Sequence, residues 1–240
     1  GKTTLAEALL AASGVIGRAG SVTEGNTVCD HDPSAVKQQR SVSLAIASFV
    51  REDVPDGPVK INLLDTPGYA DFVGELRAGL RAADAALFVV SAVDGVDEAT
   101  AALWDECASV GMPRAVAISR LDHPRADVDE AVAACRQAFG DGVLPLFLPL
   151  HGDDGQSVAG LLGLVTQQVY DYRDGHPGVA RDPDPEHLAA LDPARDELIE
   201  GIIAESEDET LMERYLAGER LDERMLIDDL ETAVARASFH

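Results

Sequence analysis

Four residues at the start of the chain have the types and order that hold a phosphate group. The segment Gly1-Lys2-Thr3-Thr4 matches the end of the pattern Gly-x-x-x-x-Gly-Lys-Ser/Thr, whose earlier residues would lie upstream of the given chain. In that pattern, backbone amides and the N-terminus of the following helix hold phosphate oxygens. Lys2 would neutralise the β- and γ-phosphates, and the Thr3 hydroxyl would bind magnesium. By itself, a segment this short also occurs by chance on protein surfaces.

A second candidate segment, Asp65-Thr66-Pro67-Gly68, directly follows an apolar stretch at residues 59–64 that we expect to be a strand. An aspartate at the end of a strand can hold magnesium through water. Gly68 has no Cβ, so its amide can approach a γ-phosphate closely. The same residues are also typical of an ordinary turn. Together, the two segments supply both halves of a magnesium–nucleotide site.

The third segment, Ser119-Arg120-Leu121-Asp122, ends another apolar stretch. The Asp122 carboxylate can accept hydrogen bonds from N1 and the exocyclic amine of guanine, a pair of donors that adenine does not offer. Taken alone, this segment cannot be told from a turn after a strand. In open α/β sheets, however, ligands bind at the carboxyl ends of strands, which is where all three segments are expected.

The elements that would position these residues alternate along the first 150 residues, as in an α/β domain with a mostly parallel sheet. The turn Asp56-Gly57-Pro58 predicts that the first two strands pair as a hairpin, and the polar stretch 17–40 has no strong periodicity. We expect helices at 3–12, 71–81, 97–110 and 127–138, and strands at 42–50, 59–64, 85–91, 114–118 and 143–148.

The composition changes after Leu150, with a turn rich in Gly and Asp at 151–155 and a loop at 174–193, which predicts a subdomain edge. From Pro193 onward we expect helix, with Asp192 as its N-cap. Two shorter helices are expected in the last 30 residues. Apolar stripes on these three helices predict a packed core rather than a ligand site.

The composition limits the possible functions of this 240-residue chain. Its 46% hydrophobic and 26% charged residues are those of an ordinary soluble protein, and no apolar run is long enough to span a bilayer. A net charge of -24 argues against direct, broad nucleic-acid binding. The three cysteines fit no disulfide or zinc pattern, which favours a reducing cytoplasm. Because the chain begins with Gly1, we expect a fragment of a longer protein.

With these segments in place, the sequence resembles the translational GTPases, most closely the elongation factor G family. Residues 39–44, Gln-Arg-Ser-Val-Ser-Leu, are similar to the family's Glu-Arg-Gly-Ile-Thr-Ile, and residues 65–72 to its Asp-Thr-Pro-Gly-His-Val-Asp-Phe. Residues 211–216 are similar to its Leu-Met-Glu-Lys-Tyr-Leu helix. The resemblance covers nearly the whole chain.

The family's roles, carried onto the matching positions, imply a full set of site residues and the cofactors GTP or GDP and Mg²⁺. Nucleotide binding is implied for Gly1, Lys2, Thr3, Thr4, Asp65, Gly68, Ser119, Arg120 and Asp122. Magnesium binding is implied for Thr3, Ser43 and, through water, Asp65. Catalysis is implied for Lys2, Gly68 and Tyr69, the last at the position of the family's catalytic histidine.

The resemblance also implies an α/β fold of the P-loop GTPase type, with three layers, a mostly parallel sheet with one antiparallel hairpin strand, and an inserted α+β subdomain. Residues 1–142 would form the GTPase core without its first strand, 143–236 the inserted subdomain, and 237–240 the return toward the core. The implied partner is the ribosome, through its stalk proteins and sarcin–ricin region. We expect a cytoplasmic monomer that binds neither membrane nor DNA.

Three departures from the family pattern lie in the site itself. Tyr69 replaces the histidine, and because a phenol has a pKa near 10 it cannot carry the positive charge of an imidazolium. We therefore expect hydrolysis to be slowed or differently triggered, unless Tyr69 only packs and another group orients the water. Ser43 replaces a threonine but keeps the hydroxyl, and Ser119 replaces an asparagine. Such departures resemble the divergent, second-copy elongation factor G-like proteins.

Three functions follow as hypotheses. The first is the GTP-binding and GTP-hydrolysing domain of an elongation factor G-like translation factor. The second is a ribosome-associated guanine-nucleotide switch with negligible hydrolysis, which Tyr69 favours and the intact Lys2, Thr3 and Asp65 oppose. The third is a P-loop ATPase unconnected to translation, against which Asp122 argues.

Overall fold

The computed structural model describes residues 1–52, 54, 57–152, 154, 157–173, 180–206, 208, 210–219 and 221–239. It divides into two compact units, Gly1–Ala85 and Ala86–His240, which we call unit 1 and unit 2 and describe separately. Both units mix helices and strands.

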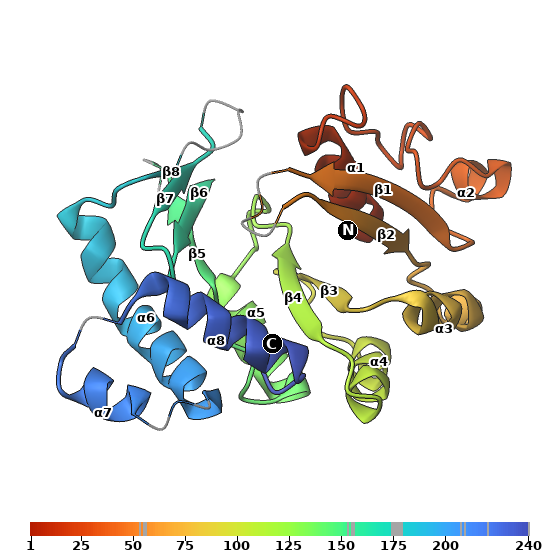
Figure 1. Cartoon of the computed structure of the whole chain (residues 1–240). Coiled ribbons are helices and arrows are strands. Elements are labelled where there is room, and N and C mark those ends of the chain that lie inside the picture. Colours follow the sequence, from red (N-terminus) through yellow and green to blue (C-terminus); the bar gives the residue numbers. More distant parts are fainter. Residues whose placement is uncertain are drawn as a thin grey trace. The chain divides into compact units, whose positions relative to one another are not determined.

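Unit 1 is built around an antiparallel hairpin beside one long helix (Figure 1). The two strands pair as the hairpin that the sequence predicts, with Ala45 opposite Asp65, although the first strand begins at Ala45 rather than at residue 42 and Asp56 of the expected turn lies outside the described residues. The first helix contacts both strands. The elements are α1 (Lys2–Ala12), α2 (Pro33–Gln38), β1 (Ala45–Arg51), β2 (Val59–Asp65), the 3-10 turn η1 (Ala70–Phe72) and α3 (Val73–Ala82).

Helix α2 lies inside the stretch 17–40, for which the sequence predicts no element. Its Asp32 N-cap accepts a hydrogen bond from the Ser34 amide at 2.7 Å, and Pro33 occupies the first turn. The helix ends at Gln39, whose φ of 50° is left-handed. With six residues, α2 is too short to show a helical period, so only its cap could have revealed it.

The first part of unit 2 contains a parallel strand pair in which Ser91 lies opposite Ser119. Asp97 and Asp127 cap the two helices by accepting hydrogen bonds from Thr100 and Glu130 amides. All four expected elements are confirmed to within about two residues at each end. They are β3 (Ala86–Ser91), α4 (Glu98–Ser109), β4 (Arg114–Ser119) and α5 (Val128–Phe139).

An aromatic cluster forms the core of this part. Trp104, the only tryptophan of the chain, is 2% exposed and stacks on Phe139 with ring centroids 4.1 Å apart. Phe88 meets the Trp104 ring edge-on at 5.0 Å. The guanidinium of buried Arg114 lies 4.7 Å from the Trp104 ring centroid, a cation–π contact.

The second part of unit 2 pairs a four-stranded antiparallel sheet, in the order β5-β6-β7-β8, with three helices (Figure 1). Helix α6 contacts both α7 and α8. The elements are β5 (Phe147–His151), β6 (Val158–Gly163), β7 (Val169–Asp171), β8 (Ala180–Arg181), α6 (Pro185–Glu205), α7 (Leu211–Leu216) and α8 (Glu223–Ala235). Their shared apolar core consists of Leu162, Leu164, Val169, Leu191, Leu198, Ile199, Ile202, Ile203, Leu211, Leu221, Leu226, Ala233 and Phe239.

Two expected boundaries in this part are wrong. The strand expected at 143–148 begins at Phe147, because the Val143 carbonyl accepts a hydrogen bond from Arg136 Nε at 3.0 Å beside the end of α5. The helix expected from Pro193 begins at Pro185, capped by Asp184. An Asp-Pro pair occurs at both places, and Pro193 is tolerated inside the helix because a 21-residue helix with a buried face can lose one backbone hydrogen bond.

Candidate functional site

Thr3 and Asp65 join the first two sequence segments inside unit 1. Thr3 lies in the first turn of α1 and Asp65 at the end of β2, and both are buried. The Thr3 hydroxyl donates a hydrogen bond to Asp65 Oδ2 at 2.7 Å. Burial raises the pKa of Asp65 above its ordinary value, and the nearby Asp30 raises it further, while the Thr3 hydrogen bond acts in the opposite direction. A group that favours the ionised carboxylate, such as a cation, would therefore be stabilising here.

Two further oxygen-bearing side chains complete this group. The Ser41 hydroxyl donates to Asp30 Oδ2 at 3.0 Å and lies 3.2 Å from Thr3 Oγ1. Asp30 is also buried. We call Thr3, Asp30, Ser41 and Asp65 the oxygen cluster. It ties the segment after α2 to the N-terminal end of α1.

The oxygen cluster fits the chemistry of magnesium. Mg²⁺ prefers oxygen ligands and is commonly bound by one or two carboxylates together with the phosphates of a nucleotide. Among the described residues, no three His, Cys, Asp or Glu side chains gather as a metal site of their own. A magnesium ion here would therefore depend on hydroxyls and phosphates as well as on Asp65.

Ser43, the expected magnesium ligand of this segment, is exposed, and it is Ser41 that contacts Thr3. The sequence offered both hydroxyls, two residues apart, and the family pattern pointed to the second. The role of Ser43 remains a prediction.

Lys2 and Gly68 lie beside one another. A Cβ atom built on Gly68 would be 2.8 Å from Lys2 Nζ, so the ammonium group sits against the glycine backbone. Gly68 is exposed and Lys2 is half-buried. The arrangement brings a cation and a sterically open backbone together, as binding of a terminal phosphate requires. Gly1 and Thr4, the other expected phosphate contacts, are exposed in the same turn.

Tyr69 follows Gly68 and is 54% exposed. The guanidinium carbon of Arg40 lies 4.9 Å from the Tyr69 ring centroid and 5.9 Å from that of Phe72. The sequence assigned Tyr69 to the position of a catalytic histidine but gave no indication of this partner.

The third segment belongs to unit 2. The Ser119 hydroxyl, at the end of β4, donates to the Val90 carbonyl at 3.1 Å. Arg120 has a left-handed φ of 60° and forms an exposed ion pair with Asp94 at 2.9 Å. Asp122 is exposed after this turn, where its carboxylate is open to a ligand. Ser119 therefore serves the strand pair, while Arg120 and Asp122 face solvent.

Glu7 is a buried carboxylate that sequence reasoning missed. It lies on α1 with no solvent exposure and accepts hydrogen bonds from the amides of Gly20 at 2.9 Å, Val28 at 2.6 Å and Cys29 at 3.4 Å. Its position between the apolar Ala6 and Leu10 was the available signal. Glu7 fastens the segment that leads to Asp30 onto the helix that begins with Lys2 and Thr3.

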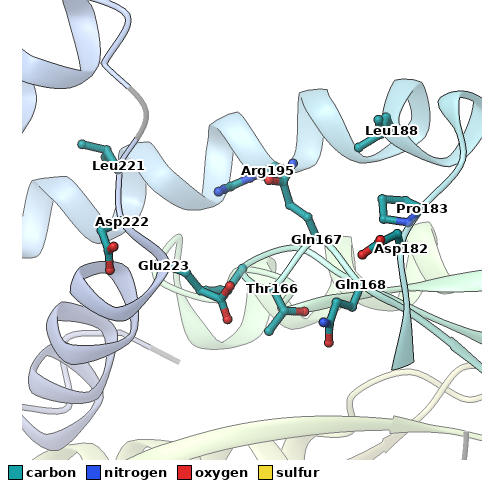
Figure 2. A pocket seen from close by; sticks show the side chains of 11 residues that line it. Thr166, Gln167, Gln168, Asp182, Pro183, Leu188, Arg195, Leu221, Asp222 and Glu223 are labelled. Carbon is teal, nitrogen blue, oxygen red and sulfur yellow. The ribbon is translucent and has the colours of Figure 1, made fainter. Parts of the chain in front are cut away.

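A cavity of about 520 Å³ lies in the second part of unit 2. Figure 2 shows polar side chains that line it, among them Thr166, Gln167 and Gln168 of the β6–β7 connection, Arg195 of α6 and Glu223 of α8. None of the residues expected to bind nucleotide lines it.

No helix in the described part of the chain has the length and apolar character needed to cross a membrane.

Comparison with known proteins gives one consistent result. The family described as elongation factor Tu GTP binding domain matches residues 1–234. The chain is 59% identical over 239 residues to the elongation factor G-like protein of two Mycobacterium tuberculosis strains, a match that covers 100% of this chain and 32% of the relative. It is 32% identical over 205 residues to elongation factor G 2 of Streptomyces coelicolor, covering 85% of this chain and 29% of that protein.

A crystal structure of a protein from Thermus thermophilus superposes on the whole chain with a TM-score of 0.87 and 36% identity, and the match covers 34% of that protein's chain. The chain thus spans about a third of the length of the relatives it matches. The P-loop GTPase fold and the elongation factor G resemblance expected from the sequence are confirmed, and the chain belongs to the elongation factor Tu GTP binding domain family, among its elongation factor G-like members.

Proposed function

We propose that the chain is the domain that binds and hydrolyses GTP in an elongation factor G-like translation factor acting on the ribosome. The observation that carries this proposal is the hydrogen bond between Thr3 and Asp65, since it joins the phosphate-binding turn and the end of β2 at one buried point. GTP or GDP and Mg²⁺ are the proposed cofactors.

The chemistry follows from positioning and charge, as is general for phosphoryl transfer. Lys2 and the Gly68 amide bind the terminal phosphate, with Gly1 and Thr4 on the other phosphates. Thr3 and Ser43, and Asp65 through water, would hold magnesium when nucleotide is bound, and the ion would supply positive charge that neutralises developing charge on the phosphates. Tyr69 orients the attacking water through its hydroxyl, without the positive charge of an imidazolium.

Base recognition is assigned to unit 2. Asp122 would accept hydrogen bonds from guanine, with Arg120 beside it, and Ser119 would brace the segment through its bond to the Val90 carbonyl. Adenine lacks the matching donors, so GTP should be preferred to ATP.

The segments 38–44 and 65–75 would be ordered by the γ-phosphate and released on hydrolysis. Residues 1–142 would serve as the GTPase core, 143–236 as an insert facing the ribosomal stalk proteins, and 237–240 as the return to the core. The full-length protein would contact the sarcin–ricin region and act as a cytoplasmic monomer.

A second candidate is a ribosome-bound nucleotide switch that hydrolyses GTP negligibly. The feature that favours it is Tyr69, whose ring is occupied by the Arg40 cation. In that case, GTP binding alone would arrange the two segments.

The deciding experiment is GTP hydrolysis by the full-length protein with and without ribosomes, with binding of fluorescent GTP measured in the same sample. Strong stimulation by ribosomes, lost in Lys2→Ala, supports the enzyme. GTP binding without stimulation supports the switch. Competition by ATP as effective as by GDP would contradict both, because Asp122 would then not select guanine.

A further inference from the structure

The Arg40 side chain reaches two aromatic rings in the segment after β2. Its guanidinium carbon lies 4.9 Å from the Tyr69 ring centroid and 5.9 Å from that of Phe72, both within the range of a cation–π interaction. The Phe72 amide donates to the Tyr69 carbonyl at 3.0 Å, and the tight turn η1 keeps the two residues together. One cation therefore contacts two rings that the backbone links.

The backbone holds Arg40 in place from both sides. Its amide donates to the Ala35 carbonyl at 3.2 Å at the end of α2, and the next residue, Ser41, belongs to the oxygen cluster. Arg40 Nε also donates to Gln38 Oε1 at 2.9 Å, which sets the direction of the guanidinium plane. The cation is thus presented from an anchored point rather than from the middle of an unsupported loop.

The charge of Arg40 suits a phenol better than a protonated imidazole. The face of a tyrosine ring carries the negative part of its quadrupole and attracts a cation, whereas two positive charges about 5 Å apart repel each other. Arg40 thus favours an uncharged ring at position 69, and it connects the segment 38–44 directly to the segment 65–75.

We propose that Arg40 is a positioning residue that holds the Tyr69 ring in place for the attack on GTP. This inference rests on the proposed GTP hydrolysis. The hydroxyl of Tyr69 would act on the water, while Arg40 acts only through the ring.

The kinetic test uses the full-length protein with ribosomes. Arg40→Gln should lower kcat about three- to ten-fold, which is the size of a partly exposed cation–π contact, while KM and the affinity for fluorescent GTP change less than about two-fold. Arg40→Lys, which keeps the cation, should recover most of kcat. The matched control is Arg18→Gln, which alters an exposed arginine and should leave kcat unchanged.

A double-mutant cycle isolates the contact. Because Tyr69→Leu removes the ring, adding Arg40→Gln to it should lower kcat no further. If the two losses instead multiply, or if Arg40→Gln alone has the kcat of the unmodified protein, the proposal is overturned.

A measurement without catalysis separates this proposal from the proposed function. Trypsin cleaves after arginine, so cleavage of the Arg40–Ser41 bond in the full-length protein reports how firmly Arg40 is held. Tyr69→Leu should speed this cleavage several-fold, and Tyr69→Phe, which keeps the ring, should not, with unchanged melting temperatures showing that both variants are folded. Equal cleavage rates in all three proteins would overturn the contact. If the protein binds GTP without stimulation by ribosomes, yet Tyr69→Leu is cleaved faster, the proposed GTP hydrolysis is wrong and the contact between Arg40 and Tyr69 stands.

Discussion

Unit 1 and unit 2 bury different kinds of side chain. Among the described residues, the buried polar or charged side chains are Thr3, Glu7, Thr27, Asp30, Asp65 and Arg114, and all but the last lie in unit 1. Both large apolar core clusters lie in unit 2. In the part of the chain that the structure describes, unit 1 therefore buries several hydrogen-bonded polar side chains beside a few apolar ones such as Leu10, whereas unit 2 has packed apolar cores.

The buried polar side chains of unit 1 fit the nucleotide binding proposed for it. Buried carboxylates are costly unless they are hydrogen-bonded or paired with a cation. Unit 1 carries that cost where phosphate and magnesium are expected, so a bound nucleotide should stabilise it strongly. The second part of unit 2 has an apolar core of its own and should depend little on nucleotide.

The largest expected effect in unit 1 comes from Glu7→Leu. The substitution leaves three amides, those of Gly20, Val28 and Cys29, without their acceptor, and the loss should be about 3 kcal/mol or more. Hydrogen exchange of these three amides and urea unfolding would measure it.

The matched control for Glu7→Leu is Glu24→Gln, because Glu24 is exposed and accepts one side-chain hydrogen bond, from Asn26. It should change the free energy of unfolding by less than about 0.5 kcal/mol. Unchanged exchange rates in Glu7→Leu would show that unit 1 does not depend on this carboxylate.

In unit 2, Gly160→Ala should cost about 2 to 3 kcal/mol. A Cβ at this position would lie 2.1 Å from the Tyr170 carbonyl oxygen of the neighbouring strand, and a paired backbone cannot move aside cheaply. Gly74→Ala in α3 is the control, since nothing lies within 4 Å of the added atom. In Gly160→Ala, amide exchange should become faster in β6 and β7 alone if the two units are stabilised independently. Equally faster exchange in unit 1 would contradict that independence.

The pH dependence of stability in the Asp65→Asn variant tests the cost of burying the charge of Asp65. Because burial raises the folded-state pKa of Asp65, the protonated carboxyl stabilises the fold at low pH, and this stabilisation is lost as the pH rises through the folded pKa. At pH 7 the asparagine variant without nucleotide should therefore melt at a higher temperature than the unmodified chain. The gain should vanish below about pH 3.8, the ordinary aspartate value.

The same Asp65→Asn variant should bind Mg·GTP more weakly, by calorimetry, because it loses the carboxylate that would hold magnesium through water. A variant that melts at a lower temperature at pH 7 would show that the oxygen cluster stabilises unit 1 even without a cation.

The smallest expected effects distinguish two neighbouring hydroxyls. Ser41→Ala removes the hydroxyl that lies between Asp30 and Thr3 and should cost about 1 kcal/mol without nucleotide. Ser43→Ala alters an exposed side chain and should leave stability unchanged while weakening GTP binding relative to GDP. Thermal melts and nucleotide titrations of both variants would test this. If Ser41→Ala instead weakens GTP binding relative to GDP and Ser43→Ala lowers the stability, Ser41 would be the nucleotide-dependent ligand.

The sequence predicted most elements of the first 150 residues, since their caps and apolar periods are local signals. It did not predict α2, which spans fewer than two helical turns, and it set the start of α6 at Asp192-Pro193, the last of three Asp-Pro pairs in residues 182–193. The Asp184 cap and the burial of Leu191, the residue before Asp192, show that the helix already exists before Pro193.

The residues of the candidate site fall into the same two groups, those with a local signal in the sequence and those without one. Lys2, Thr3, Asp65 and Gly68 were identified because motifs fix their spacing. Glu7 and Asp30 were missed, since a carboxylate in the sequence carries no mark of being buried. The contact of Arg40 with Tyr69 joins residues 29 positions apart, and no local pattern predicts it.

The aromatic cluster of unit 2 gives the chain a built-in optical label. Because Trp104 is the only tryptophan and stands between Phe88, Phe139 and Arg114, its emission comes from one apolar environment in one unit. Excitation near 295 nm, which selects tryptophan over tyrosine, should thus follow the melting of unit 2. Tyrosine or circular dichroism signals would also include unit 1, and a separation of the two curves on adding GTP would show that nucleotide stabilises unit 1 more than the part of unit 2 that Trp104 reports.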